Sequence, residues 1–295
     1  MGKKRLSIGF PAYNAEKFMR HSLDSVLGQS FGDFELIISD NASTDSTGEI
    51  CRRYGAMDKR IRYYRNDKNV GASANFNRVF ELSSGRYFKW ISYDDACAPE
   101  FLEKCVKVLD RDPSVVLAYP RTTLIDKDGD KIKDFHENLH LQSERPHERL
   151  RQLLLNINFA NPVFGVIRSD VLRKTRLLGG FFGADYILLM EICLLGKFFE
   201  IPERLFFYRE HEKNSRKLPK PDLTYWWDTS FRGVMNNTQR RLVSEQFKSI
   251  NRTDLPWLEK ALCYLQIRRW VFRYWRAKGG KYKARLKRKL MAERG

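Results

Sequence analysis

Short apolar runs alternate with longer amphipathic stretches along residues 6–95. Runs rich in bulky and β-branched residues are typical of buried strands, and apolar positions spaced about 3.6 residues apart are typical of helices. The predicted strands cover 6–10, 34–39, 61–65 and 87–92, and the predicted helices cover 15–29, 46–54 and 72–82. This alternation predicts an α/β fold with a Rossmann-like, mostly parallel sheet flanked by helices.

The pattern continues less regularly beyond residue 95. We predict helices at 99–109, 150–157, 169–174 and 184–195, strands at 115–119, 161–167 and 198–208, a turn at 126–130 and a loop at 136–149. Pro219 and Pro221 predict a linker, followed by helical stretches at 223–247 and 257–294. The predicted division is 1–120, 121–215 and 216–295, the last being a helical, basic C-terminal extension.

Polar clusters follow three of the predicted strands. They are Pro11–Asn14, Asp40–Asn41 and Asp94–Asp95. Ligands of parallel sheets bind at the carboxyl ends of the strands, so we expect the three clusters to meet in one crevice. The adjacent carboxylates of Asp94 and Asp95 repel each other, and Mg²⁺ or Mn²⁺ is their natural partner. The pair alone is more typical of a solvated turn or of a cap for the helix after Pro99.

The order of these motifs resembles a known family. The relevant segments are Ile8–Asn14, Phe34–Asp45, Asn69–Gly71 with Asn75, and Ser84–Tyr87 leading to Ser92–Asp95. Together they resemble the nucleotide-diphospho-sugar transferases of glycosyltransferase family 2, which adopt the GT-A fold. The resemblance covers about the first 120 residues, with weaker similarity as far as His211. It implies that 1–120 bind a nucleotide-sugar donor and that 121–215 bind the acceptor.

The resemblance implies roles for the residues at the strand ends. Pro11 and Tyr13 would pack the nucleotide base, and Asp40 would accept a hydrogen bond from it, with helix capping as the alternative for Asp40. Gly71 and Asn75 would lie near the diphosphate or the ribose, although Gly71 also suits a simple turn. A UDP-sugar is the favoured donor.

The same resemblance implies a metal site for Mn²⁺ or Mg²⁺. Asp95 would bind the ion directly, and Asp94 would contact the ribose or a metal-bound water. Family members usually carry a further Asp at the position of Ser92, so one ligand or ribose contact is expected to be lost or replaced by water. Arg209 would close over the diphosphate, and His211 would ligate the metal, although a single histidine is more often structural.

The general base is expected at the start of a helix. The family commonly places an acidic dipeptide there, and Ala184–Asp185 followed by apolar residues fits this pattern. Asp185 would then deprotonate a hydroxyl of a glycan or lipid-linked acceptor, and the sugar would be transferred with inversion. A capping role is the alternative for Asp185.

The net charge of +18 indicates an anionic partner, namely nucleic acid, an anionic membrane surface or a phosphorylated substrate. From Arg268 onward, cations alternate with aromatic residues, which is typical of an interfacial membrane helix. No run approaches the ~18 apolar residues of a spanning helix, no signal peptide is recognisable, and the five cysteines form no Cys-x-x-Cys pair. We therefore expect a cytoplasmic protein at the inner face of an anionic membrane. A packed helix with a solvated basic face is the alternative.

Two other functions compete with glycosyl transfer. A catalytically weak transferase-fold module that binds an anionic membrane or nucleic acid through its basic tail gains support from Ser92 and Ala184. Nucleic acid is the less favoured of these partners, because nothing before the tail supports it. A nucleotidyltransferase is disfavoured, since no glycine-rich, Arg/Lys-lined loop follows the first strand. The sugar, the acceptor and the linkage are not predicted.

Overall fold

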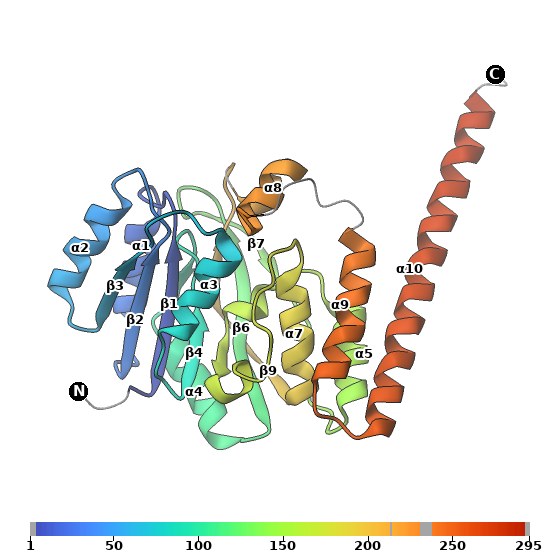
Figure 1. Ribbon diagram of the computed structural model, residues 1–295, viewed down its shortest axis with the longest axis horizontal. Helices are drawn as coiled ribbons and strands as arrows, with labels where there is room; N and C mark the ends of the chain where they lie inside the picture. Colours follow the sequence, from blue (N-terminus) through green and yellow to red (C-terminus); the bar gives the residue numbers. More distant parts are fainter. Residues whose placement is uncertain (1–3, 213, 231–237, 293–295) are drawn as a thin grey trace.

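The protein's structure is a computed structural model that describes residues 4–212, 214–230 and 238–292. One nine-stranded sheet in the order β3-β2-β1-β4-β8-β6-β9-β5, with β7 beside β6, forms its centre, and helices flank it (Figure 1). The strands are β1 Leu6–Ala12, β2 Phe34–Asp40, β3 Ile61–Arg65, β4 Tyr87–Trp90, β5 Ala96–Cys97, β6 Val115–Ile125, β7 Lys131–Phe135, β8 Val166–Arg168 and β9 Lys197–Arg209. This arrangement confirms the predicted α/β class with a mostly parallel sheet.

Strands β1 to β4 form the parallel half of the sheet. Ala12 lies opposite Asp40 at the ends of β1 and β2, and Gly9 lies opposite Trp90 in β4. Every residue of β1 and β2 is buried, as apolar runs covered by helices on both faces should be. The loops that follow these strands therefore meet at one edge, as the sequence predicts.

The second half of the sheet reverses direction twice. Strand β8 is antiparallel to both β4 and β6, and β9 runs parallel to β6. Two reversals restore the original direction, so β9 ends at the same edge as β4. Strand β6 crosses residue 120, which means that the first two predicted parts share one sheet; their boundary stays a prediction.

The helices cover the faces of the sheet. They are α1 Met19–Leu27, α2 Thr47–Met57, α3 Ala72–Glu81, α4 Phe101–Arg111, α5 Pro146–Asn156, α6 Ser169–Leu172, α7 Ala184–Leu195, α8 Lys220–Trp227, α9 Thr238–Arg252 and α10 Trp257–Ala292, with short 3₁₀ helices at Asn161–Phe164 and Ser215–Lys217. Helix α10 packs against α5 and α9, and Figure 1 shows its end extending beyond the body. Within the described ranges, no helix has both the length and the apolar character needed to cross a membrane.

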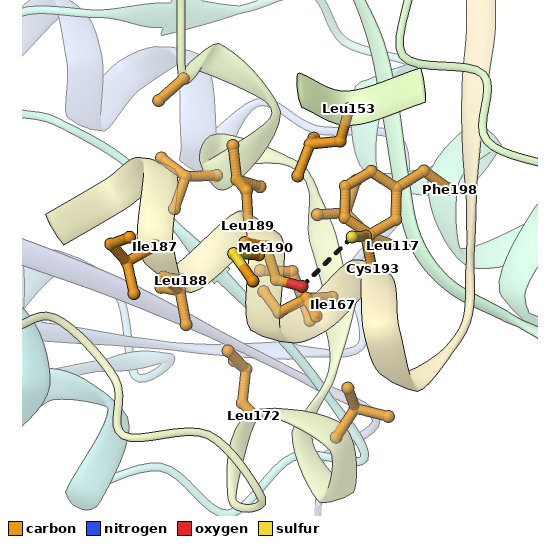
Figure 2. Close-up of a cluster of buried hydrophobic side chains, with 14 of the residues drawn as sticks. Leu117, Leu153, Ile167, Leu172, Ile187, Leu188, Leu189, Met190, Cys193 and Phe198 are labelled. Atoms are coloured by element: carbon orange, nitrogen blue, oxygen red, sulfur yellow. Dashed lines mark hydrogen bonds between the residues drawn. The ribbon is translucent and has the colours of Figure 1, made fainter. Parts of the chain in front are cut away.

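Helix α7 lies at the centre of the core beside the sheet. Figure 2 shows Leu188, Leu189 and Met190 of α7 among side chains from β6, α5, β8 and β9. The Cys193 thiol donates a hydrogen bond to the Met190 carbonyl oxygen at 3.1 Å. All five cysteines are buried and form no disulfide.

Several predicted boundaries are wrong. The first helix begins at Met19 instead of residue 15, and α5 begins at Pro146 within the predicted loop. Proline suits the first helical turn, where its missing N–H is not needed. Helix α8 likewise contains Pro221 in its first turn, although the sequence predicts a linker there. The predicted strand 161–167 starts as a 3₁₀ helix, and residues 228–230 follow the end of α8 inside the predicted helix 223–247.

Candidate active site

A cavity of about 560 Å³ lies at the edge where β1, β2 and β4 end. Six of the predicted site residues line it: Pro11, Tyr13, Asn75, Asp94, Asp95 and Asp185. The other four, Asp40, Gly71, Arg209 and His211, lie behind this lining. The structure therefore brings together the predicted base-binding loop, the acidic pair and the predicted general base.

Asp95 occupies the connection between β4 and β5. Its side chain is only 1% exposed, and Oδ1 accepts a hydrogen bond from the backbone N–H of Arg209 at 3.0 Å. The other oxygen, Oδ2, makes no hydrogen bond with any residue that the structure describes. Burial, reinforced by the neighbouring charge of Asp94, raises the pKa of Asp95 well above its usual range. A cation beside this carboxylate would relieve that cost.

Asp94 is held by two polar side chains. Its Oδ1 accepts a hydrogen bond from the Ser92 hydroxyl, and its Oδ2 lies 2.8 Å from Nε2 of His211. Ser92 was expected to mark a lost ligand contact. In the structure its hydroxyl orients Asp94, a role that hydrogen bonds from neighbouring side chains commonly play around metal ligands.

Arg209 contacts both members of the acidic pair from the side away from the cavity. Its Nε donates to the Asp94 carbonyl at 2.9 Å, Nη1 donates to the Asp126 carbonyl at 3.0 Å, and Nη2 lies 2.8 Å from Nδ1 of His21. The guanidinium group is buried and does not line the cavity. Its observed contacts fix the loop, and its predicted closure over a diphosphate stays a prediction.

The three predicted metal ligands do not form a ready-made site. Within the described part of the chain, no three His, Cys, Asp or Glu side chains are arranged to hold an ion. The imidazole of His211 is engaged with Asp94, while Asp95 offers one oxygen without a partner among the described residues. Hard oxygen donors of this kind fit Mg²⁺ or Mn²⁺, which often complete their coordination with water and phosphate oxygens.

Asp40 is fully buried at the end of β2. Its Oδ2 accepts hydrogen bonds from Arg65 at 2.6 Å and from the Tyr63 hydroxyl at 3.0 Å, and its Oδ1 accepts one from the Ser43 N–H at 2.8 Å. These contacts organise the turn after β2. A direct hydrogen bond to a nucleotide base stays a prediction, and it would require the base to reach behind the present cavity lining.

Gly71 and Asn75 shape the wall beside α3. Gly71 has φ +85°. A Cβ atom there would lie 2.9 Å from the Trp227 carbonyl oxygen, so the end of α8 packs directly against this glycine. The Asn75 amide donates to the Ser39 carbonyl at 2.9 Å and keeps its side chain at the cavity. Gly71 therefore allows α8 to pack closely at this wall, and its predicted place near the diphosphate or the ribose stays a prediction.

Asp185 lies in the first turn of α7 and is half-buried at the cavity wall. Its Oδ1 accepts a hydrogen bond from the Tyr186 N–H at 3.0 Å. Burial raises the pKa of Asp185, while that N–H group and the nearby charge of Arg216 lower it in part. The capping position belongs to Gly183, so Asp185 is not the helix cap.

Several cavity residues were missed by the sequence analysis. Arg216 lines the cavity with its guanidinium carbon 3.9 Å from the Phe159 ring centroid, and Trp226 and Trp227 of α8 form a further wall. The run of aromatic residues at 225–227 was a signal, but only the folded chain places it over the ends of β1 and β2.

The fold and the site define an α/β protein with acidic side chains at a nucleotide-type crevice. The chain belongs to glycosyl transferase family 2, because the model of that family matches residues 7–176. Membership places the protein among the glycosyltransferases.

Known proteins agree with this assignment. An uncharacterized glycosyltransferase of Methanocaldococcus jannaschii is 31% identical over 137 residues, which are 46% of this chain and 47% of that protein. The chain therefore spans about half the length of this relative. The fold is similar to S. aureus TarS 1–349 in complex with UDP-GlcNAc, with a TM-score of 0.64, 16% identity and coverage of 88% and 70%. It is also similar to a Pyrobaculum calidifontis mannosyltransferase with GDP-Man and Mn²⁺, with a TM-score of 0.54, 17% identity and coverage of 90% and 70%. These two likenesses show the GT-A type fold alone.

Proposed function

We propose that the protein transfers a sugar from a nucleoside diphosphate donor to a hydroxyl of a glycan or lipid-linked acceptor, with inversion at the anomeric carbon. The observation that carries the proposal is that Asp95 and Asp185 line the same cavity as Pro11 and Tyr13. One cavity thus offers a cation-binding carboxylate, a second carboxylate for proton transfer and a place for a base. We also infer a cytoplasmic location from the unpaired cysteines.

The donor would lie along the ends of β1 and α3. Pro11 and Tyr13 offer an apolar and aromatic surface for the base, and Tyr13 is 39% exposed and therefore free to stack. Arg216 lines the cavity and would contact the diphosphate, in place of the buried Arg209. A UDP-sugar is the favoured donor, and the TarS structure with UDP-GlcNAc supports this choice.

A divalent ion would be held by Asp95 through its Oδ2, with Asp94 contacting a metal-bound water or the ribose. When bound, Mn²⁺ or Mg²⁺ neutralises the charge that develops on a departing diphosphate. The mannosyltransferase structure with Mn²⁺ supports this assignment. Ser92 and Arg209 keep the two carboxylates in place through their hydrogen bonds. Direct ligation by His211 stays a prediction.

Asp185 would act as the general base. Its carboxylate takes the proton of the acceptor hydroxyl while the hydroxyl oxygen attacks the anomeric carbon, and the nucleoside diphosphate leaves from the opposite face. A pKa raised by burial makes this carboxylate a better proton acceptor than an exposed aspartate.

The test is turnover of UDP-sugars with Mn²⁺, read as release of UDP with and without glycan acceptors. Asp95→Ala should abolish turnover, and the control Asp128→Ala, in an exposed turn, should retain it. Thermal shifts with UDP and Mn²⁺ report binding separately. A wild-type protein that binds neither UDP-sugars nor Mn²⁺ would refute the proposal. It would favour the catalytically weak module that binds an anionic membrane or nucleic acid through its basic tail.

A further inference from the structure

A basic and apolar surface runs along α5 and α10, and none of its residues lines the cavity. We call it the α5–α10 face, and it consists of Arg151, Leu155, Leu265, Arg269, Phe272, Arg273 and Arg276. Its apolar members are unusually open for a folded protein, because Phe272 is 62% exposed and Leu155 is 48% exposed. Apolar groups that gather on a surface between cations mark an interaction site.

Helical spacing explains why these side chains share one face. Leu258, Leu265 and Phe272 are seven residues apart, which is close to two helical turns, so they form one stripe. All three are exposed, whereas Cys263 and Ile267 on the opposite side of α10 are fully buried in the core. The inner side of α10 thus packs into the core, whereas the outer apolar stripe stays largely exposed among the described residues.

A shallow hollow of about 140 Å³ lies between the two helices. It is lined by Arg151, Arg269 and Arg273 together with the apolar residues Leu154, Leu155 and Trp270. Three cations beside apolar residues match a group that is anionic at one end and hydrocarbon at the other. A phospholipid has this chemistry, since guanidinium groups pair with phosphate oxygens.

The acidic side chains of this helix pair lie at the other end. Glu259 sits 2.8 Å from Nδ1 of His147, and Glu148 accepts a hydrogen bond from the Ser143 hydroxyl. The arginines therefore dominate the later turns of both helices, and α10 adds seven more Lys and Arg residues in 278–289, whose side chains lie outside the described part. A second copy of the chain would bring the same positive charge to this face, so self-association is disfavoured.

We propose that the α5–α10 face binds the surface of an anionic lipid bilayer. The arginines pair with anionic head groups, and Leu155, Leu265 and Phe272 enter the boundary between head groups and acyl chains. The interaction depends on both parts, because cations alone attract any polyanion and apolar groups alone bind any bilayer. The proposal is independent of the transfer reaction, so either can fail without the other.

Co-sedimentation of the full chain with vesicles tests this proposal. We expect binding to vesicles of phosphatidylcholine mixed with phosphatidylglycerol, and much weaker binding to phosphatidylcholine alone. Arg269→Gln with Arg273→Gln should weaken binding to mixed vesicles roughly 25-fold, at about fivefold for each cation. Leu265→Ser with Phe272→Ser should weaken it at least tenfold. Met57→Ser is the matched control, because Met57 is 73% exposed on α2 and should leave binding unchanged.

Three results would overturn the proposal. The first is the absence of vesicle binding, and the second is equal binding to both vesicle types. The third is binding that weakens in the arginine variant alone, accompanied by equally tight binding of duplex DNA, which would identify a nucleic-acid surface. Circular dichroism of each variant verifies folding, and UDP binding measured in parallel verifies that the cavity is intact.

Discussion

The backbone N–H of Arg209 donates a hydrogen bond to Oδ1 of Asp95 across 3.0 Å, although 114 residues separate the two in sequence. The side chain of the same arginine holds the Asp94 carbonyl and the Asp126 carbonyl. The end of β9 thus fixes both members of the acidic pair. The geometry of the proposed metal site depends on this contact between the two halves of the sheet.

Arg209→Ala should lower the free energy of unfolding by about 2–4 kcal/mol, because it leaves buried carbonyl groups without donors. Urea unfolding followed by circular dichroism measures the change. The donor affinity in the presence of Mn²⁺ should fall as well, since Asp94 loses its support. Arg52→Ala, at an exposed position of α2, is the control and should change stability by less than ~0.5 kcal/mol. Unchanged stability in Arg209→Ala would contradict the positioning role.

Asp185→Asn should reduce kcat by about 10²–10⁴, the usual contribution of a general base. The amide keeps the size of the side chain but cannot take the acceptor proton, so the dissociation constant for UDP should stay the same. Steady-state kinetics and calorimetry give the two quantities. Asp170→Asn, at an exposed first-turn position of α6, should retain full activity. A variant of Asp185 with wild-type kcat would exclude it as the base.

Arg216→Ala should move the acid limb of the pH–rate profile to higher pH. The positive charge of Arg216 lowers the pKa of Asp185, so its removal raises that pKa further, and more alkaline solution is needed to ionise the base. The profile of kcat/KM against pH reports this shift. If the acid limb does not move, the charge of Arg216 does not influence the pKa of Asp185.

Glu137 introduces a pH dependence of stability. Burial raises its pKa from 4.5 to about 6, and its Oε2 is buried without a hydrogen bond to the described residues. The folded state binds this proton more tightly, so the contribution favours folding below pH ~4.5 and is lost as pH rises through about 6. The loss is on the order of 2 kcal/mol.

Glu137→Gln should remove most of this dependence, because the amide stays neutral and can still accept hydrogen bonds from Thr122 and Asn161. Unfolding free energies between pH 4.5 and 7 provide the measurement. If wild type and Glu137→Gln show the same slope over this range, the carboxyl group is ionised normally.

Gly71→Ala should destabilise the protein by at least ~1–2 kcal/mol, the cost of placing a side chain in left-handed backbone. The added Cβ would also meet the Trp227 carbonyl oxygen and push α8 away from the cavity. Thermal unfolding and UDP affinity should both report the change. Gly32→Ala is the matched control, because no atom of the described residues, apart from its chain neighbours, lies within 4 Å of a Cβ placed there.

Local signals were sufficient where the chemistry is local. The apolar runs of β1 and β2 and the helical spacing of α1 identified these elements from the sequence, and the polar strand ends indicated the crevice. A strand that is buried on both faces of a sheet needs a continuous apolar run, so this pattern in the sequence predicts the α/β fold class. The sequence pattern failed at Pro146 and Pro221, where proline lies in the first turn of a helix whose packing partners are distant in sequence.

The sequence by itself determined the parallel half of the sheet, the motif order of the family and the candidates Asp94, Asp95 and Asp185. Tertiary structure decided which of the predicted residues reach the cavity. It paired Asp40 with Arg65, and it hydrogen-bonded Arg209 to the backbone of Asp94. It also brought Arg216 and α8 to the crevice. The reason is physical: a carboxylate or guanidinium group finds its partners in space, and 114 residues of sequence separate Asp95 from the N–H that holds it.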